Sequence, residues 1–297
     1  MRRHWAPGLS RRSLVLFGAA ALAACGRPAE EAKSAPDKAP APKRGGMSLA
    51  EAVAGDWRSA QDKGRDAWRH PRETLEFFGL KPGMTVVEFW PGAGWYTDIL
   101  APFLAATGGK LYAANLQPTD EASREVVNAF RRKLEADPKL YGQVEVTAFG
   151  LTSGPVAPAG SADMALFLRN LHNWMAAGIA EKAFRDAFLA LKPGGVLGIE
   201  EHRANPGGVQ DPLAADGYVQ QDYVVQLAQE AGFVLQAASE INANPNDTKD
   251  HPFGVWTLPP VRRTSPRGQP DDPAFDRTKF DAIGESDRMT LRFVKPG

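Results

Sequence analysis

Short apolar runs alternate with longer amphipathic stretches along most of the chain. The apolar runs are nearly uninterrupted, as is typical of parallel strands covered on both faces, and cover 84–90, 110–116, 144–149, 163–168, 196–201 and 234–239. Amphipathic stretches between them predict helices near 96–106, 120–135, 176–191 and 219–231. A last run over 289–294 alternates with charged residues and predicts an antiparallel strand. The pattern therefore predicts an α/β fold, a Rossmann-like doubly wound sheet of seven strands whose last strand is antiparallel.

The segment before the first apolar run predicts two helices. Ser48 and Glu51 have the spacing of a capping box, and apolar residues follow at helical spacing toward His70. Pro71 breaks this helix and suits the first turn of a second one, which ends at Gly79. We expect the ordered part of the chain to begin near Ser48.

The N-terminus has the pattern of an export signal. Four arginines precede an apolar run over 14–24 that is far too short to span a bilayer as a mature helix. The run ends in Leu22-Ala23-Ala24-Cys25, which resembles the lipobox of bacterial lipoproteins. The alternative is a short core helix with an ordinary buried cysteine. We predict a signal peptide over 1–24, lipidation of Cys25, and a location in the cell envelope, lipid-anchored to the membrane and facing the periplasm.

Two further features belong to this N-terminal region. Arg11-Arg12 and the residues around them resemble a twin-arginine export signal. Residues 26–46 are rich in proline, alanine and charge, so they cannot bury enough surface to offset their ordering entropy. We predict a lipidated cysteine and disordered tether over 25–46 and one folded domain over 47–297.

One stretch of the expected domain breaks the alternation of strands and helices. Residues 242–288 contain seven prolines, asparagines at 242, 244 and 246, and little periodicity. An irregular insertion of this size in a compact domain is usually a lid or a binding loop, or else partly disordered. We favour a lid.

Composition and charge limit the partners. The chain has 35 basic and 35 acidic residues, and four arginines lie in the first 24 residues, which leaves 31 basic against 35 acidic residues in the mature body. A mildly acidic body with no basic block argues against nucleic acid as a partner. Cys25 is the single cysteine, so no disulfide forms within the chain. We expect a monomer that meets the membrane through its lipid anchor.

A glycine loop follows the first strand of the expected sheet. Residues 86–97 read VVEFWPGAGWYT, a strand that runs into Gly92-Ala93-Gly94 and opens a helix. Glycines there let the backbone approach a ligand closely, and the helix N-terminus offers unpaired N–H groups. A dinucleotide-binding fold would have a third glycine where Thr97 stands, which disfavours a dehydrogenase.

The loop resembles motif I of the class I S-adenosylmethionine-dependent methyltransferases, in which an acidic residue precedes spaced glycines. The order of helices and strands over 65–297 is also similar to that fold, which makes the expected sheet one of the class I methyltransferase type. More narrowly, the chain is similar to a bacterial family of predicted methyltransferases in four blocks: WPGAGWYT, RNLHNW from 169, VWTLPP from 255 and GESDR from 284.

This resemblance implies S-adenosylmethionine as cofactor and a set of residues that bind it. Glu88 would orient the loop and the methionine end of the cofactor, and the backbone of Gly92, Ala93 and Gly94 would pass beneath it. The implied set is completed by Tyr96 in the same block, Asn115 at the end of the second strand and Asn170 after the fourth.

Two positions depart from the general motif. Trp90 stands at the first glycine and precedes Pro91, which predicts a stiffer loop and a smaller pocket. Asn115 stands where an acid usually holds the ribose hydroxyls, and an amide lacks the charge-assisted strength of a carboxylate. We expect weakened or altered cofactor affinity.

Candidate catalytic residues follow the strands, because ligands of such sheets bind at the carboxyl ends. Methyl transfer is an in-line displacement that needs alignment and, when the nucleophile carries a proton, a base. We predict His172 as this base, with Glu201 and His202 as further catalytic candidates. The alternative is a capping network after the strand.

A metal centre is the competing chemistry at these strand ends. Potential ligands are Glu200, Glu201, His202, Asp247, Asp250 and His251. No HExxH or His-x-His spacing occurs, however, and Glu200 and Glu201 should point to opposite faces of a strand. We predict no metal. Arg65, Arg69 and Arg288 are candidates for an anionic substrate group, although pairing at the surface is the usual role of such arginines.

Two functions remain open. The first is an S-adenosylmethionine-dependent methyltransferase that acts on an unidentified small molecule or envelope component. The second is a non-catalytic ligand-binding lipoprotein that retains the fold. The intact glycine loop favours the enzyme, whereas the envelope location favours the binding protein, because S-adenosylmethionine is made in the cytoplasm.

Overall fold

The computed structural model describes residues 46–297. The expected signal peptide, the lipidation site Cys25 and all but the last residue of the expected tether lie outside these residues. Within 46–297, the helices are too short or too polar for any of them to cross a membrane. The described residues belong to one compact unit.

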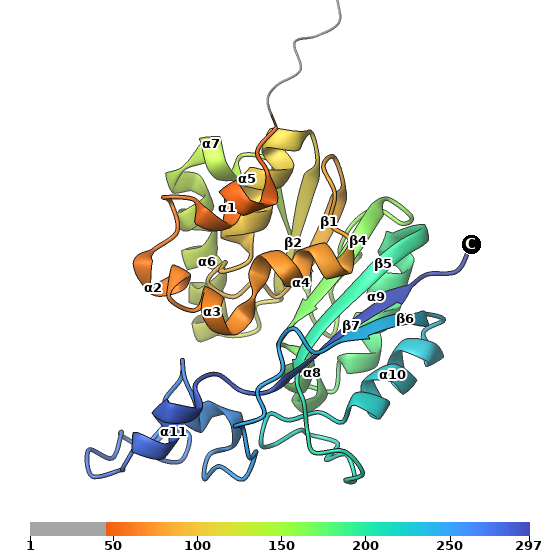
Figure 1. Ribbon diagram of the computed structural model, residues 1–297. Coiled ribbons are helices and arrows are strands. Elements are labelled where there is room, and N and C mark those ends of the chain that lie inside the picture. The colour runs from red at the N-terminus through yellow and green to blue at the C-terminus, as the bar shows by residue number, and fades with distance from the viewer. Residues whose placement is uncertain (1–45) are drawn as a thin grey trace, which may run out of the picture. The chain divides into compact units, whose positions relative to one another are not determined.

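A seven-stranded sheet with the order β3-β2-β1-β4-β5-β7-β6 forms the centre of this unit (Figure 1). Its strands are β1 (Thr85–Phe89), β2 (Lys110–Leu116), β3 (Val144–Phe149), β4 (Ala162–Leu168), β5 (Leu191–His202), β6 (Val234–Ser239) and β7 (Arg288–Val294). Neighbouring strands pair in parallel, except that β7 is antiparallel to both β5 and β6. The predicted Rossmann-like doubly wound sheet is confirmed. Its strand order reverses between β1 and β4, so the carboxyl ends of these strands flank the ligand crevice of the fold.

Helices cover both faces of the sheet (Figure 1). One face carries α4 (Pro71–Phe78), α5 (Thr97–Thr107) and α6 (Glu121–Ala136), accompanied by the short helices α1 (Leu49–Ala54), α2 (Ala60–Lys63), α3 (Asp66–Arg69) and α7 (Pro138–Tyr141). The other face carries α8 (Leu171–Ala176), α9 (Ala180–Ala190) and α10 (Gln221–Glu230). The connection between β6 and β7 contains a 3₁₀ turn, η1 (Gly254–Thr257), and α11 (Thr278–Ile283).

Each face of the sheet has its own hydrophobic cluster. On the α8–α10 face, the ring centroids of Phe89 and Phe167 lie 4.8 Å apart, and those of Phe167 and Trp174 lie 4.7 Å apart. On the other face, Phe78 and Leu100 are buried in a second cluster. Full burial of side chains of this size contributes roughly 2–3 kcal/mol each. The central strands, including β1 before the glycine loop, are therefore packed against a hydrophobic cluster on each face of the sheet.

The first predicted helix is wrong in its extent. The capping box of Ser48 and Glu51 is present, but the chain between Ser48 and His70 forms the three short helices α1, α2 and α3. The second predicted helix is confirmed as α4, with Pro71 in its first turn and Gly79 at its end.

A tertiary contact ends α1 early. The Trp57 ring folds back over Gly55, where an added Cβ would lie 2.2 Å from the ring. The Trp57 indole also donates a hydrogen bond to the carbonyl of Asp98 in α5 at 2.7 Å. Packing against α5 thus overrides the helical spacing, since intrinsic propensity is only a weak preference.

α8 is a helix that the sequence pattern did not predict. Residues 171–176 form it directly after β4, and the predicted helix over 176–191 begins only at Ala180. Gly178, with φ +66°, separates the two helices. Residues 192–195, which read KPGG and have the composition of a turn, lie within the first residues of β5.

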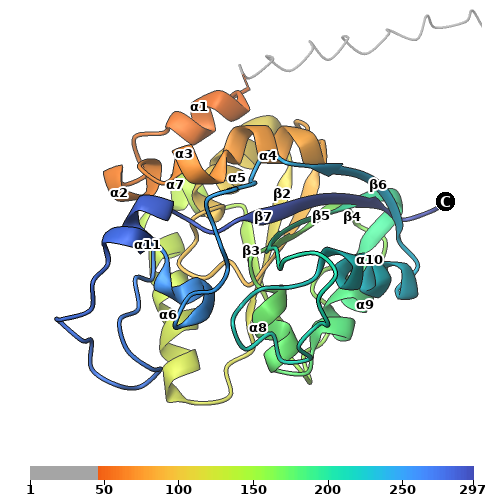
Figure 2. The ribbon, with the colours of Figure 1, turned by 60° about the horizontal axis from the view of Figure 1, so that its bottom comes forward.

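The insertion over 242–288 is packed against the domain. Asp247 is buried and accepts hydrogen bonds from the Tyr218 hydroxyl at 2.9 Å, from the His251 ring at 2.7 Å and from the Asp287 N–H at 2.8 Å. Figure 2 shows α11 and its loops near α2 and α3, and the segment ends where β7 begins. The insertion is therefore fastened at the carboxyl end of the parallel strands.

Candidate functional site

The glycine loop joins β1 to α5 through three left-handed residues. Trp90, Gly92 and Gly94 have φ values of +47°, +60° and +89°. A Cβ at Gly92 would meet nothing within 4 Å, whereas one at Gly94 would lie 3.1 Å from the Lys133 Nζ of α6. Lys133 also donates to the carbonyl of Ala93 at 2.9 Å. The loop is therefore braced on its α6 side and open at Gly92.

The carboxyl group of Glu88 is buried beside this loop. Thr97, at the start of α5, donates its hydroxyl hydrogen to Glu88 Oε2 at 2.7 Å. Burial raises the pKa of Glu88 to about 7, although the Thr97 hydrogen bond acts in the opposite direction. The group therefore changes charge near neutral pH, and perturbed groups of this kind concentrate at functional sites.

Asn115 at the end of β2 has an unused donor. Its Oδ1 accepts the backbone N–H of Leu116 at 2.7 Å, and its Nδ2 is buried without a hydrogen-bond partner among residues 46–297. After β1, the Trp90 indole reaches past β2 to the end of β3, where Nε1 donates to the Phe149 carbonyl at 2.9 Å. The Trp90 ring also meets the Trp174 ring edge to face, with centroids 6.0 Å apart. The Trp90 ring thus packs against the cluster on the α8–α10 face, and the unsatisfied amide of Asn115 lies at the end of the neighbouring strand β2.

Two of the predicted cofactor residues hold the loop in place. The Tyr96 hydroxyl donates to Glu200 Oε2 at 2.9 Å, which ties the loop to β5. Burial and the charge of Glu200 raise the pKa of Tyr96 well above its ordinary value. Asn170 Nδ2 donates to the carbonyls of Trp90 at 3.0 Å and Leu168 at 3.3 Å, which ties the end of β4 to the loop. In the structure, both side chains position the loop.

The predicted catalytic residues His172, Glu201 and His202 come together at the ends of β4 and β5. Nδ1 of His172 lies 2.9 Å from Oε1 of Glu201. Oε2 of Glu201 accepts the backbone N–H groups of Leu171 and His172 at 2.6 and 3.4 Å. Because a carboxylate only accepts hydrogen bonds, Nδ1 of His172 carries a proton, and Nε2 is the basic nitrogen of the neutral ring. Glu201 therefore starts α8 and orients His172.

His202 stands beside this pair. Its ring centroid is 5.1 Å from that of His172, and its Nδ1 lies 2.5 Å from Ser286 Oγ. Burial, followed by the charges of His172, Arg288 and Arg169, lowers the pKa of His202 well below its ordinary value. The His202 ring is therefore neutral near pH 7.

His172, Glu201 and His202 also have the spacing of a metal site. One potential ligand atom from each lies within 4.8 Å of the others. Glu201, however, already accepts hydrogen bonds from Leu171 N, His172 N, His172 Nδ1 and His202 N. With its lone pairs occupied, Glu201 acts here as an orienting group, and the absence of a metal stays a prediction.

Glu200 points to the opposite face of β5 from its neighbour, as predicted. Its Oε1 lies 3.0 Å from Nε of Arg288, a close ion pair without hydrogen-bond alignment. Glu285 is paired with Arg65 at 3.0 Å, Arg69 at 2.8 Å and Arg288 at 2.7 Å. The three arginines that the sequence suggested for an anionic substrate are therefore paired with a carboxylate of the protein.

Ser286 is a residue of this site that was not predicted, and Trp256 and Arg169 were not predicted as partners of the residues that they meet here. Ser286 hydrogen-bonds to His202, the Trp256 ring lies 5.9 Å from that of His172, and Arg169 lies 3.9 Å from Glu200. Ser286 and Trp256 belong to the insertion, which has no periodicity that would place them. The available signal was their membership of the VWTLPP and GESDR blocks, which the resemblance singled out.

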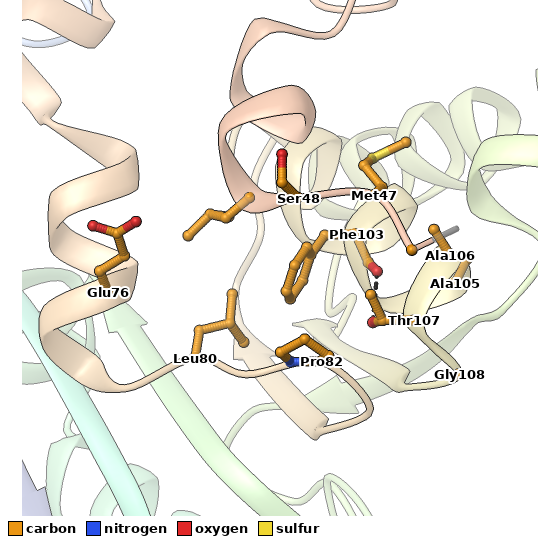
Figure 3. Close-up of a pocket in the computed structure, with 12 residues that line it drawn as sticks. Met47, Ser48, Glu76, Leu80, Pro82, Phe103, Ala105, Ala106, Thr107 and Gly108 are labelled. Carbon is orange, nitrogen blue, oxygen red and sulfur yellow. Dashed lines mark hydrogen bonds between the residues drawn. The ribbon is translucent and has the colours of Figure 1, made fainter. Parts of the chain in front are cut away.

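A hollow of about 800 Å³ lies at the other end of the sheet (Figure 3). Pro82, Phe103 and Thr107, which precede β1 and β2 in the chain, line it together with Met47. Among residues 46–297, Glu76 is the single ionisable residue in its lining. The hollow is separate from the glycine loop and offers no candidate catalytic group.

Solved structures of other proteins share this fold. A sarcosine dimethylglycine methyltransferase candidate from Galdieria sulphuraria has a TM-score of 0.52 and 15% identity, covering 83% of this chain and 89% of that one. The [4+2]-cyclase SpnF has a TM-score of 0.51 and 16% identity, covering 84% and 91%. An S-adenosylmethionine-dependent methyltransferase from Aquifex aeolicus has a TM-score of 0.49 and 21% identity, covering 66% and 94%. Neither a protein-family model nor a curated protein sequence matches the chain.

The fold is thus the Rossmann-like fold of the class I methyltransferases, with the expected antiparallel seventh strand. Likeness at this level of identity defines the fold alone. The cyclase SpnF shares this fold, so activity has to be argued from the site. The narrower resemblance to a bacterial family of predicted methyltransferases stays a prediction.

Proposed function

We propose that the chain is an S-adenosylmethionine-dependent methyltransferase that acts on a small molecule or an envelope component. The observation that carries this proposal is the glycine loop, which is open at Gly92 and adjoins strand ends that hold an oriented His172–Glu201 pair. A cofactor crevice and a base are then neighbours at one edge of the sheet.

The residues around the loop fit the nucleoside part of the cofactor. The unpartnered Nδ2 of Asn115 is a donor for a ribose hydroxyl oxygen, and leaving it unsatisfied costs about 1–3 kcal/mol. The Trp90 ring, which is partly exposed, offers a flat apolar surface for the adenine. Trp90 then has a role in place of the glycine of the general motif.

The methionine part would lie over the open backbone at Gly92, near Glu88. Gly92 and Ala93 are exposed, so the backbone there is accessible to a ligand. The bound cofactor would supply a methyl group activated by a sulfonium, and the protein supplies binding, orientation and proton transfer.

His172 is the proposed base. Its Nδ1 proton is held by Glu201, which leaves the Nε2 lone pair to take a proton from the acceptor nucleophile. The neutral His202 ring beside it adds no charge that would compete for this proton. General-base catalysis of this kind typically contributes 10²- to 10⁴-fold in rate.

We further propose that the chain is exported and anchored through a lipid on Cys25. Export by the twin-arginine route would carry a folded domain with its cofactor already bound. This allows one turnover unless the ligand is replenished. The proposed envelope location favours the second candidate, a non-catalytic lipoprotein that binds a different ligand, because S-adenosylmethionine is made in the cytoplasm.

Isothermal calorimetry on residues 46–297, which contain both hydrophobic clusters and the whole sheet, tests the cofactor. S-adenosylmethionine and S-adenosylhomocysteine should both release or absorb heat, and Asn115→Ala should weaken both, because it removes the free donor. Absence of heat and of a thermal shift at millimolar ligand would sink the methyltransferase proposal and leave the binding lipoprotein.

A further inference from the structure

Arg169 directly follows β4 in a left-handed conformation. Its φ is +59°, and its backbone N–H donates to the Glu200 carbonyl at 2.7 Å. Left-handed residues other than glycine are strained, and they cluster at ligand sites, where the surrounding structure enforces them. Trp90, directly after the neighbouring strand β1, has the same feature with φ +47°. Both central strands thus end in a strained residue with a large side chain.

The Arg169 guanidinium makes no hydrogen bond within residues 46–297. Its side chain is 15% exposed and its Nη1 is buried without a partner. Carboxylate oxygens of Glu200 and Glu285 each lie 3.9 Å from Nη1, beyond hydrogen-bond distance. A guanidinium has five N–H donors, and buried charges in proteins are normally paired and hydrogen-bonded. Arg169 therefore has donors available for a ligand.

The nearby carboxylates are already engaged by other groups. Four guanidinium groups, which we call the arginine cluster, surround Glu200 and Glu285; they belong to Arg65, Arg69, Arg169 and Arg288. Four positive charges thus face two negative ones. Arg65 is 23% exposed and partly solvated, so the buried part of the cluster lacks one negative charge.

The positive charge of Arg169 acts both on a histidine at the strand ends and on the glycine loop. It contributes, after burial, to the lowered pKa of His202, and it also acts on Tyr96 of the glycine loop. Arg169 precedes the candidate base His172 by three residues. A positive field of this kind favours an anionic group of a ligand beside Arg169.

We propose that Arg169 binds a carboxylate of the methyl acceptor, so that the acceptor is a small carboxylic acid held beside His172. This rests on the proposed methyltransferase function. A carboxylate matches the guanidinium fork with two parallel hydrogen bonds. A phosphate dianion would need more donors, and the other three guanidinium groups of the cluster are held by Glu285.

Thermal unfolding of residues 46–297 without cofactor tests the carboxylate site. Benzoate at tens of millimolar should raise the midpoint at constant ionic strength, and benzamide, its uncharged counterpart, should not. Arg169→Gln should weaken benzoate binding by about tenfold or more, and Arg169→Lys by less. Arg185→Gln, at an arginine on α9 that is 60% exposed, is the control and should leave binding unchanged. A wild-type protein without a benzoate shift, or an Arg169→Gln variant that keeps it, would overturn the proposal.

Thermal unfolding of the variants without ligand checks that their folding is intact. Arg169→Gln removes a positive charge that makes no hydrogen bond within residues 46–297 and lies in a cluster with more positive than negative groups, so its own midpoint should be at or above that of the wild type. A lower midpoint would mean that the guanidinium is structural and would count against a ligand role.

Calorimetry separates the acceptor from the cofactor, which also carries a carboxylate. Arg169→Gln should leave the affinities for S-adenosylhomocysteine and for 5′-methylthioadenosine, which lacks the carboxylate, unchanged. Loss of about tenfold for S-adenosylhomocysteine alone would assign Arg169 to the cofactor and overturn the acceptor proposal. Benzoate binding in a protein that ignores both nucleosides would support the carboxylate site and refute the methyltransferase.

Discussion

Nδ1 of His172 and Oε1 of Glu201 lie 2.9 Å apart, and both residues are buried. The same carboxylate accepts the backbone N–H of Leu171 at 2.6 Å, at the first residue of α8. One side chain of β5 therefore fixes both the start of a helix and the orientation of the candidate base. A change at Glu201 is expected to act on stability and on His172 together.

Glu201→Gln should lower the free energy of unfolding by about 3 kcal/mol, because the amide NH₂ meets N–H donors where an acceptor is required. Urea unfolding at pH 7 measures the change. Glu145→Gln, at an exposed ion pair with Lys110, is the control and should cost less than about 1 kcal/mol. Equal stability of the two variants would contradict the role of Glu201.

Glu88 should make stability depend on pH. The pKa of the Glu88 carboxyl is about 7 in the folded protein, against its ordinary value of 4.5 in the unfolded chain. Between these two pH values, Glu88 is ionised in the unfolded chain and protonated in the folded protein. The contribution of Glu88 to the free energy of unfolding is fully present below pH 4.5. It is lost as the pH rises through 7, which lowers the free energy of unfolding by about 3 kcal/mol in all.

Urea unfolding of the wild type and of Glu88→Gln at pH 5 and pH 8 tests this contribution. The variant keeps an acceptor for Thr97 and has no charge to bury, so it should gain stability relative to the wild type at the higher pH. A difference between the two proteins that is the same at both pH values would show that Glu88 is ionised in the folded state at both.

Gly92→Val should weaken S-adenosylhomocysteine binding by about tenfold or more, because its side chain would occupy the open space over the loop. The left-handed backbone makes the substitution cost about 1–2 kcal/mol of stability. Gly108→Val is the matched control, since Gly108 has φ +79° and also meets nothing within 4 Å, but lies at the other end of α5. Calorimetry should find normal affinity in the control, and equal affinity in both variants would mean that the ligand binds elsewhere.

Asp247→Asn should loosen the insertion over 242–288. It weakens the acceptor for Tyr218, which lies outside the insertion, and for His251 and the backbone of Asp287, which lie within it. Limited proteolysis within the insertion should become about tenfold faster or more, while the sheet keeps its circular dichroism. Unchanged cleavage would mean that Asp247 is not the main anchor.

The strands show how much could be predicted. β2, β3 and β6 begin and end at the predicted residues, because their apolar runs are visible in the chain itself. Only β2 is buried along most of its length, whereas β3 and β6 are the two edge strands and are largely half-buried or exposed. The meeting of His172, Glu201 and His202 also followed from the pattern, since the carboxyl ends of parallel strands share one edge. The helix over 48–70 failed because Trp57 packs against α5, a contact that no local spacing encodes.

Sequence alone was enough for the order of elements, the fold, the glycine loop and the strand ends that carry the candidate base, since each depends on local periodicity and a topological rule. The export signal and Cys25 also come from the sequence and lie outside the described residues. Only folding determines which buried polar groups find partners. Arg69 meets Glu285, 216 positions away, whereas Arg169 and Asn115 keep donors without a partner in the described part of the chain, 46–297. Pairing in a desolvated interior depends on distances between residues far apart in the chain, so it becomes visible only in the tertiary structure.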